Sequence, residues 1–184
     1  MRTNPCSVAM FVLAVAGPNF AAAATIAVSA ERHGDTIEIQ ASTLLGADAA
    51  TAWLVLTDYD RYAEFIPDLR ESRVVARRGA TVTVEQSGDA VLWLLRMPLH
   101  ITFEITEIPP QRLESHALAG SLRSLQSRYV LVSESSGVRL EYTGRIAPGF
   151  EFFGQLEELV VRQNVTRQFQ ALADEIERRS AARR

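Results

Sequence analysis

The chain has no lysine and only one cysteine among its 184 residues, so all nineteen basic residues are arginines. The cysteine, Cys6, precedes an apolar run that is typical of a leader. If that leader is removed, the mature chain has no cysteine, which excludes disulfides, thiolate metal sites and a cysteine nucleophile. The formal net charge of −3 gives no reason to expect nucleic acid or an anionic membrane surface as a partner.

The sequence also lacks an apolar run of the ~20 residues that a membrane-spanning helix needs. Residues 1–24 instead resemble a signal peptide, with Arg2, an apolar stretch over residues 8–16 and an A-x-A site at residues 22–24. We therefore expect cleavage before Thr25 and a bacterial protein that is periplasmic or secreted. An uncleaved N-terminal anchor is the alternative. The remaining residues, 25–184, are enough for one domain with a substantial core.

Alternation of apolar and polar residues predicts a series of strands from Thr36 onward. Residues 25–32 are an undetermined lead-in, and Asp48 is expected to cap a short helix over residues 49–56. Residues 87–89 are expected to form a turn, and the alternation from Val91 to Ile105 predicts one long strand. Pro98 in that strand indicates a bulge, a bend or an edge position. Further strands are expected over residues 70–77, 81–85, 113–118, 122–132 and 138–143.

One amphipathic helix, roughly residues 150–178, is expected to close the chain. Its apolar face combines Phe152, Phe153, Leu156, Leu159, Val160, Phe169, Leu172 and Ile176. Gln163 and Thr166 interrupt that face near its middle, and a dry core would rarely hold such groups without hydrogen-bond partners. Either they bond to the sheet or lie at the edge of the stripe, or this part of the helix faces a cavity that holds water or ligand.

Residues 58–67, DYDRYAEFIP, together with the order of strands and helices around them, resemble the START/polyketide cyclase (SRPBCC) superfamily. The resemblance is greatest to its polyketide cyclase/dehydrase and coenzyme Q-binding START-like branch, and it covers about residues 36–180. It implies an α+β helix-grip fold, a curved antiparallel β-sheet wrapped around a long C-terminal α-helix. Residues 25–184 would then be one START-like domain. Within it, residues 58–67 either plug one end of the core or form a mobile lid.

The sequence selects no catalytic residue. The three histidines, His33, His100 and His116, have no metal-site spacing, and no phosphate-binding loop, dinucleotide fingerprint or nucleophile elbow is present. Arg123 and Arg128 could point inward and hold an acidic group. If His116 and both arginines lie on the outer surface, most enzymatic hypotheses fail. We expect no metal and no cofactor.

Large residues expected to face inward are the better candidates for ligand contact, because aromatic and methionine side chains suit an irregular apolar ligand. They are Trp93, Met97, Tyr129, Tyr142, Phe152, Leu156 and Gln163. The leading hypothesis is an exported carrier of a hydrophobic small molecule, such as a lipid, quinone or polyketide-like compound, with transient contact to a membrane. The alternatives are a cyclase or dehydratase acting on a polyketide-like substrate, and an envelope protein that docks on a partner. The sequence does not indicate an oligomeric state.

Overall fold

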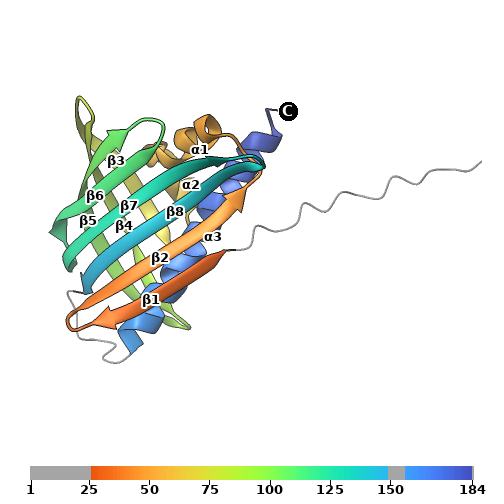
Figure 1. Cartoon of the computed structure of the whole chain (residues 1–184). Coiled ribbons are helices and arrows are strands. Elements are labelled where there is room, and N and C mark those ends of the chain that lie inside the picture. Colours follow the sequence, from red (N-terminus) through yellow and green to blue (C-terminus); the bar gives the residue numbers. More distant parts are fainter. Residues whose placement is uncertain (1–25, 149–155, 184) are drawn as a thin grey trace, which may run out of the picture.

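Eight antiparallel strands form one curved sheet in the computed structural model, which describes residues 26–148 and 156–183. The spatial order is β1-β2-β8-β7-β6-β5-β4-β3, so most chain neighbours are also sheet neighbours (Figure 1). The strands are β1 (Ala27–His33), β2 (Thr36–Leu45), β3 (Leu69–Arg78), β4 (Thr81–Leu92), β5 (Leu95–Ile108), β6 (Arg112–Gly120), β7 (Leu122–Glu134) and β8 (Gly137–Pro148). The lead-in of the sequence prediction is thus partly a strand, β1, paired with β2.

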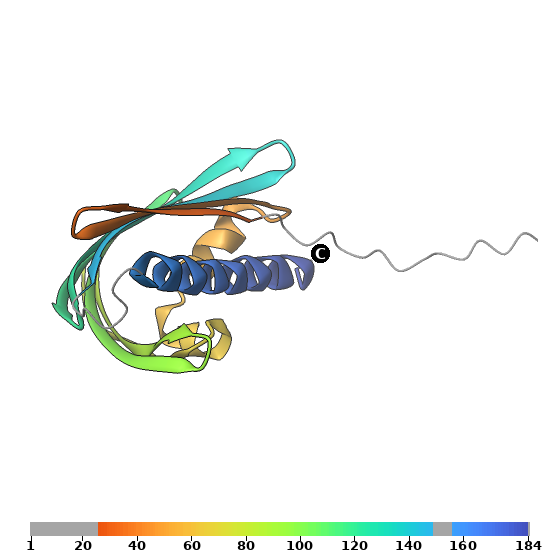
Figure 2. The ribbon, with the colours of Figure 1, turned by 90° about the horizontal axis from the view of Figure 1, so that it is seen from below.

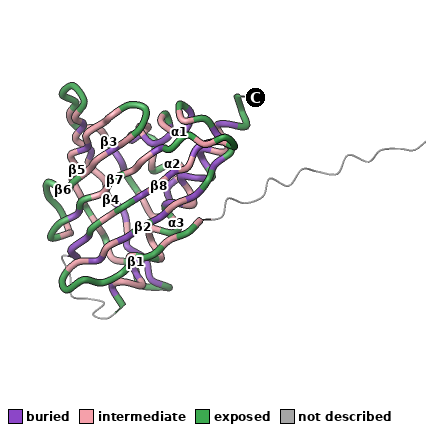
Figure 3. The backbone as a smooth tube through the Cα atoms, in the orientation of Figure 1, coloured by how far each residue is buried: buried purple, intermediate pink, exposed green. Residues whose placement is uncertain are grey.

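The long C-terminal helix α3 (Glu157–Ala181) lies in the concave face of this sheet (Figure 2). Apolar residues on one side of α3 are buried against the sheet, among them Val160, Phe169 and Ile176. On the facing strand β2, buried Ile37 and Ile39 alternate with more exposed polar residues, as Figure 3 shows for the strands that cover α3. This arrangement confirms the predicted helix-grip fold.

Three short helical elements connect β2 to β3 and cover one end of the concave face. They are α1 (Ala49–Leu56), the 3₁₀ helix η1 (Tyr59–Arg61) and α2 (Tyr62–Phe65). Asp48 caps α1 as predicted, because its Oδ1 accepts a hydrogen bond of 2.6 Å from the Thr51 amide. That bond also lowers the pKa of the Asp48 carboxyl.

Two predictions about the middle of the sheet are wrong. Residues 87–89 do not turn, and the expected single strand from Val91 to Ile105 is broken at Trp93 and Leu94, where β4 ends and β5 begins. Trp93 adopts a left-handed backbone conformation, with φ of 52°, without a glycine or asparagine to indicate it. Gly88, read as part of a turn, lies within β4. A glycine is required there because a Cβ would come within 2.4 Å of the Asp68 carbonyl oxygen.

The sheet separates between β6 and β7 at one end. These strands pair only over Arg112–His116 and Gln126–Val130. Beyond that point β6 continues along β5, while the first residues of β7 stay with β8. Because β6 ends at Gly120, opposite Ile101, the first part of β5 pairs with β4 alone, and Pro98 occupies the predicted edge position.

Candidate functional site

Two adjoining cavities lie between α3 and the concave face of the sheet. The apolar cavity, of about 170 Å³, is bounded mainly by β4, β5, β7 and the N-terminal half of α3. The tyrosine cavity, of about 160 Å³, is bounded by η1, α2, β5–β8 and the middle of α3. Both walls include Leu69, Gln86, Phe103, Leu125 and Gln168, so the cavities meet at these residues. A wider hollow of about 510 Å³ lies over charged residues on the outer sheet face and is open.

Small residues in one row of the sheet create the depth of the tyrosine cavity. Ser115 pairs with Ser127 across β6 and β7, and Ser127 pairs with Gly144 across β7 and β8. The two serine hydroxyls lie 2.7 Å apart and hydrogen bond to each other. A Cβ on Gly144 would come within 2.6 Å of the Tyr142 hydroxyl, so Gly144 makes room for that phenol over its own strand.

Four tyrosines supply much of the remaining wall of this cavity. Tyr59 and Tyr62 come from η1 and α2, while Tyr129 and Tyr142 come from β7 and β8, where their rings lie 4.8 Å apart. The Tyr59 hydroxyl donates to Glu107 and the Tyr62 hydroxyl donates to the Leu56 carbonyl. The Tyr129 hydroxyl has no hydrogen-bond partner among the residues that the structure describes.

Burial keeps these phenols protonated. It raises the pKa of Tyr142 to about 12, and it raises the pKa of Tyr59, Tyr62 and Tyr129 above the ordinary value for tyrosine. A protonated phenol can donate or accept a hydrogen bond but is a poor general base near neutral pH. The tyrosines therefore suit recognition of a polar group better than proton abstraction.

The uncharged polar residues of α3 that face the cavities are Asn164 and Gln168, and the carboxylate of Glu157 borders the apolar cavity at the start of the helix. Asn164 bonds to the sheet, because its amide accepts from the Val91 nitrogen and donates to the Val91 carbonyl oxygen. Gln163, which the sequence prediction placed inward, is half-buried but lies in neither cavity wall. Thr166 is exposed and bonds to the Arg162 carbonyl of its own helix. Thr166 thus lies at the edge of the apolar stripe, as one alternative expected, whereas the bond to the sheet and the position facing a cavity belong to the neighbouring residues Asn164 and Gln168.

The structure brings together only some of the predicted ligand-contact residues. Tyr129 and Tyr142 line the tyrosine cavity. Met97 packs with Ala90, Leu92 and Val160 beside the apolar cavity. Trp93 does not face inward, because it lies at the β4–β5 turn with 74% of its surface exposed. Leu156, just before α3, is 44% exposed, and Phe152 lies outside the described residues.

The residues that sequence reasoning missed are Gln86, Ser115 and Ser127, all on inward positions of strands. The sequence did contain a signal for them. Each is a polar residue at one of the alternate positions of its strand that otherwise hold buried apolar residues. A polar residue on a concave face indicates either a satisfied hydrogen bond or a cavity. Here Gln86 donates to Ser72 and both serines border the tyrosine cavity.

The residues considered for acid–base chemistry lie on the outer face of the sheet. His116 is exposed beside Glu104, Arg128 pairs with Glu114, and Arg123 donates to the Pro148 carbonyl. His33 and His100 are also exposed. Within residues 26–148 and 156–183, no cluster of three or more histidine, aspartate or glutamate side chains could hold a metal ion.

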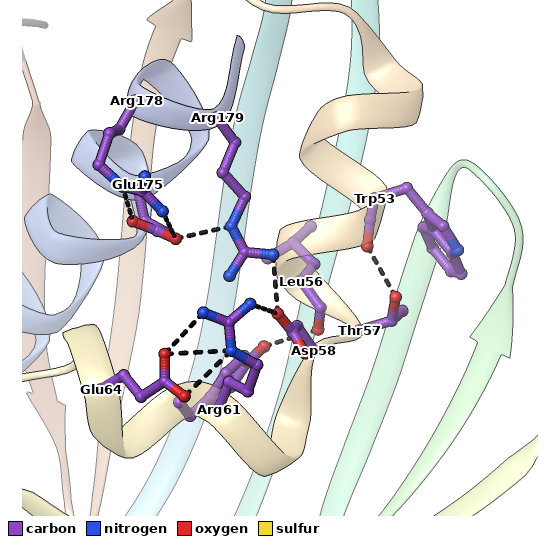
Figure 4. A network of polar contacts seen from close by, with 10 residues as sticks. Trp53, Leu56, Thr57, Asp58, Arg61, Glu64, Glu175, Arg178 and Arg179 are labelled. Atoms are coloured by element: carbon purple, nitrogen blue, oxygen red, sulfur yellow. Dashed lines mark hydrogen bonds and ion pairs between the residues drawn. The ribbon is translucent and has the colours of Figure 1, made fainter. Parts of the chain in front are cut away.

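A network of charged side chains fastens α3 to the segment that closes the tyrosine cavity (Figure 4). Arg179 donates to Glu175 on its own helix and to Asp58 just before η1, at 2.6 and 2.7 Å. Its guanidinium also lies 5.8 Å from the centre of the Phe65 ring. Arg61 pairs with Glu64 and Asp58 in the same network. The segment of residues 58–67 is thereby held in place over the cavity.

Glu175 is the buried centre of this network. The hydrogen bond from Arg178, with a further bond from Arg179, lowers the pKa of the Glu175 carboxyl to about 2. Glu175 is therefore ionised at any pH near neutrality, and the ion pairs persist. Tyr59 and Ile66 of the fastened segment are buried in the core, which agrees with its predicted role as a plug at one end.

A family model described as polyketide cyclase/dehydrase and lipid transport matches residues 45–173. No curated protein matches the chain significantly. The matched residues include both tyrosine-bearing segments, the separated end of the sheet and most of α3.

Solved structures with very different sequences share this fold. A STAR-related lipid transfer protein from Xanthomonas axonopodis is 15% identical, with a TM-score of 0.69 over 84% of this chain and 98% of that one. The Zhui aromatase/cyclase from Streptomyces sp. R1128 is 12% identical, with a TM-score of 0.67 over 80% and 95%. The protein TTHA0849 from Thermus thermophilus is 18% identical, with a TM-score of 0.67 over 79% and 98%.

Proposed function

This chain belongs to the family of polyketide cyclases, dehydrases and lipid transport proteins, and we propose that it binds and carries a hydrophobic small molecule between the sheet and α3. The observation that supports the proposal is the pair of adjoining cavities under α3. The exposed lining of the apolar cavity is mostly carbon, and each methylene group of a ligand buried there contributes about 0.8 kcal/mol. A lipid, a quinone or a polyketide-like compound would suit such a site.

Binding is preferred to catalysis because the cavity walls offer little acid–base chemistry. Neither wall includes a histidine among the described residues, and the tyrosines are held protonated. The carboxylates of the apolar cavity, Asp68, Asp89 and Glu157, are each paired with an arginine. A cyclase or dehydratase needs a group that exchanges a proton near neutral pH. The aromatase/cyclase therefore resembles this chain in fold, and the comparison identifies no catalytic residue here.

Native mass spectrometry of protein purified gently from its own compartment tests this function. We expect a reproducible added mass that is lost on denaturation and recovered in an organic extract. Protein that carries no such mass, and that takes up neither lipids nor quinones, would contradict the carrier proposal. The intact mass also tests the proposed export, because cleavage of a signal peptide would leave Thr25 as the first residue.

The carrier proposal includes transient contact with a membrane through the β4–β5 turn. Trp93, Leu94 and Leu95 are 74%, 97% and 58% exposed, and together they make an apolar tip. The tip lies beyond the end of β6 and next to the cluster of Ala90, Leu92 and Val160 that borders the apolar cavity. Exposed apolar tips carrying tryptophan suit the interface between lipid headgroups and acyl chains. No helix of the described residues is long and apolar enough to span a membrane.

Replacing Trp93 and Leu94 by serine is expected to weaken binding to phosphatidylcholine vesicles by about tenfold or more, since full burial of even one large apolar side chain contributes about 1.5–3 kcal/mol. Co-sedimentation with vesicles measures the effect. The matched control replaces Leu54 and Val75, which are 47% and 42% exposed elsewhere on the surface, by serine. Equal binding of the two double variants would contradict a role for the tip.

A further inference from the structure

We infer that the tyrosine cavity receives an uncharged polar end of the ligand, a carbonyl or hydroxyl group, while the apolar body of the ligand fills the apolar cavity. The inference rests on the proposed binding function and adds the chemical class and the orientation of the ligand. Leu125, Phe103 and Gln168 border both cavities, so one molecule can extend from one into the other. Together the cavities hold about 330 Å³, which is near the lower end of the ~300–1,000 Å³ typical of ligand sites.

Hydroxyl groups converge on one part of the tyrosine cavity. Ser115 and Ser127 lie in one row of β6 and β7, and Tyr142 lies in the next row on β8, where the Tyr129 ring packs beside it at a tilt. The two serine hydroxyls bond to each other, and Ser127 also bonds to the Tyr142 hydroxyl. Because each hydroxyl has one donor and two lone pairs, the three groups together retain a donor and several lone pairs. The Tyr129 hydroxyl has a free donor among the described residues. A carbonyl or hydroxyl oxygen entering here would therefore find both donors and acceptors.

The walls exclude a charged group at this position. Within the described residues, no arginine, histidine or carboxylate lines the tyrosine cavity. The apolar cavity includes carboxylates but no cation, and these carboxylates are already paired: Asp68 with Arg167, Asp89 with Arg70, and Glu157 with Arg32. An anion would lose its hydration without gaining a cationic partner, which strongly disfavours its burial.

Three probes test this inference: naphthalene, 2-naphthol and 2-naphthoate. They share the same apolar ring system and differ only in the polar group attached to it. Equilibrium dialysis at pH 7 against the purified protein measures their affinities. We expect 2-naphthol to bind about five- to tenfold more tightly than naphthalene, as one or two net hydrogen bonds would produce. We expect 2-naphthoate to bind at least about tenfold more weakly than naphthalene, because its carboxylate has no cationic partner. Tightest binding of 2-naphthoate would overturn the inference.

The double variant Ser115→Ala with Ser127→Ala tests whether the preference for 2-naphthol over naphthalene arises in the tyrosine cavity. The variant removes both partners of the serine–serine hydrogen bond, but it also removes the bond from Ser127 to the Tyr142 hydroxyl, so circular dichroism and urea unfolding check that the fold persists. We expect the preference for 2-naphthol over naphthalene to fall to about twofold or less, with naphthalene binding unchanged. The control is Ser124→Ala, which removes an exposed hydroxyl from the same strand.

The outcomes separate the inference from the function on which it rests. If no probe binds, the carrier proposal itself fails. If naphthalene and 2-naphthol bind equally well to the unmodified protein, the ligand is held by apolar contact alone and only the inference is overturned. If the preference exists but survives in the double serine variant, the tyrosine cavity is not where the polar group lies, and the inference is again overturned.

Discussion

Leu125→Trp is expected to lower the affinity for the cargo by about a hundredfold or more while the protein stays folded. Leu125 is buried on β7 and borders both cavities, so a larger ring there would occupy the space that joins them. A ligand displaced from one cavity would leave about four methylene groups unburied, a loss of ~3 kcal/mol. Titration with a hydrophobic fluorophore measures the affinity, and circular dichroism checks the fold.

Leu118→Trp is the matched control for this experiment. Leu118 lies on the adjacent strand β6 but is 52% exposed, and it borders neither cavity. The same substitution there should leave affinity within about twofold. Binding that survives Leu125→Trp unchanged would show that the cargo is held elsewhere, for example on the open outer face of the sheet. An unfolded Leu125→Trp protein would be replaced by Leu125→Phe, a smaller increase at the same position.

The architecture could be predicted because its signals are local or repeated many times. Alternation in β2 and β8 follows from burial of one sheet face, and the broad apolar side of α3 follows from packing in the concavity. The Asp48 cap is a signal confined to a few residues. The β4–β5 turn escaped prediction because Trp93 and Leu94 are apolar, and the alternation continues across them.

The site could be predicted only in part because it depends on alignment between distant segments. Ser115, Ser127 and Gly144 form one row only once the pairings of β6, β7 and β8 are fixed. Similarly, the sequence of a 25-residue helix does not fix its rotation about its own axis. That rotation places Asn164 and Gln168 toward the cavities where Gln163 and Thr166 were expected.

The fold alone does not distinguish a carrier from an enzyme, because one fold can support unrelated functions. The distinction depends on the residues that line the cavities. In this chain many charged residues of β5–β8 form pairs on the outer face, as His116 does with Glu104 and Arg128 with Glu114. Glu107 of β5 instead accepts a hydrogen bond from the buried Tyr59 hydroxyl and pairs with Arg77. The cavity walls hold hydroxyls, amides and apolar side chains, and the three carboxylates of the apolar cavity, Asp68, Asp89 and Glu157, are each paired with an arginine. Such a lining can recognise and orient a ligand without exchanging protons with it, which favours a carrier.

Arg179→Met is expected to accelerate release of the cargo about tenfold and to lower the free energy of unfolding by about 2 kcal/mol. The Arg179 side chain is only 17% exposed and connects Glu175 of α3 to Asp58 and Phe65 on the segment that closes the tyrosine cavity. Without it, Tyr59 and Tyr62 would be held over the cavity by fewer contacts, so opening would be easier. Stopped-flow displacement of a bound fluorophore measures the release rate, and urea unfolding measures the stability.

Arg178→Met is the control that distinguishes two effects of Arg179→Met: loosening of the segment of residues 58–67, and loss of an ion pair to Glu175. Arg178 also bonds to Glu175, at 2.6 Å, but its side chain is 64% exposed and none of its hydrogen bonds or ion pairs within the described residues reaches Asp58. Because the Arg178 side chain stays largely in water and Glu175 keeps its bond from Arg179, the release rate of this variant should change by less than about threefold. Equal acceleration by both substitutions would mean that release depends on the general stability of α3. Acceleration by Arg179→Met alone would identify the segment of residues 58–67 as the gate through which the cargo leaves, because only that variant loosens its attachment to α3.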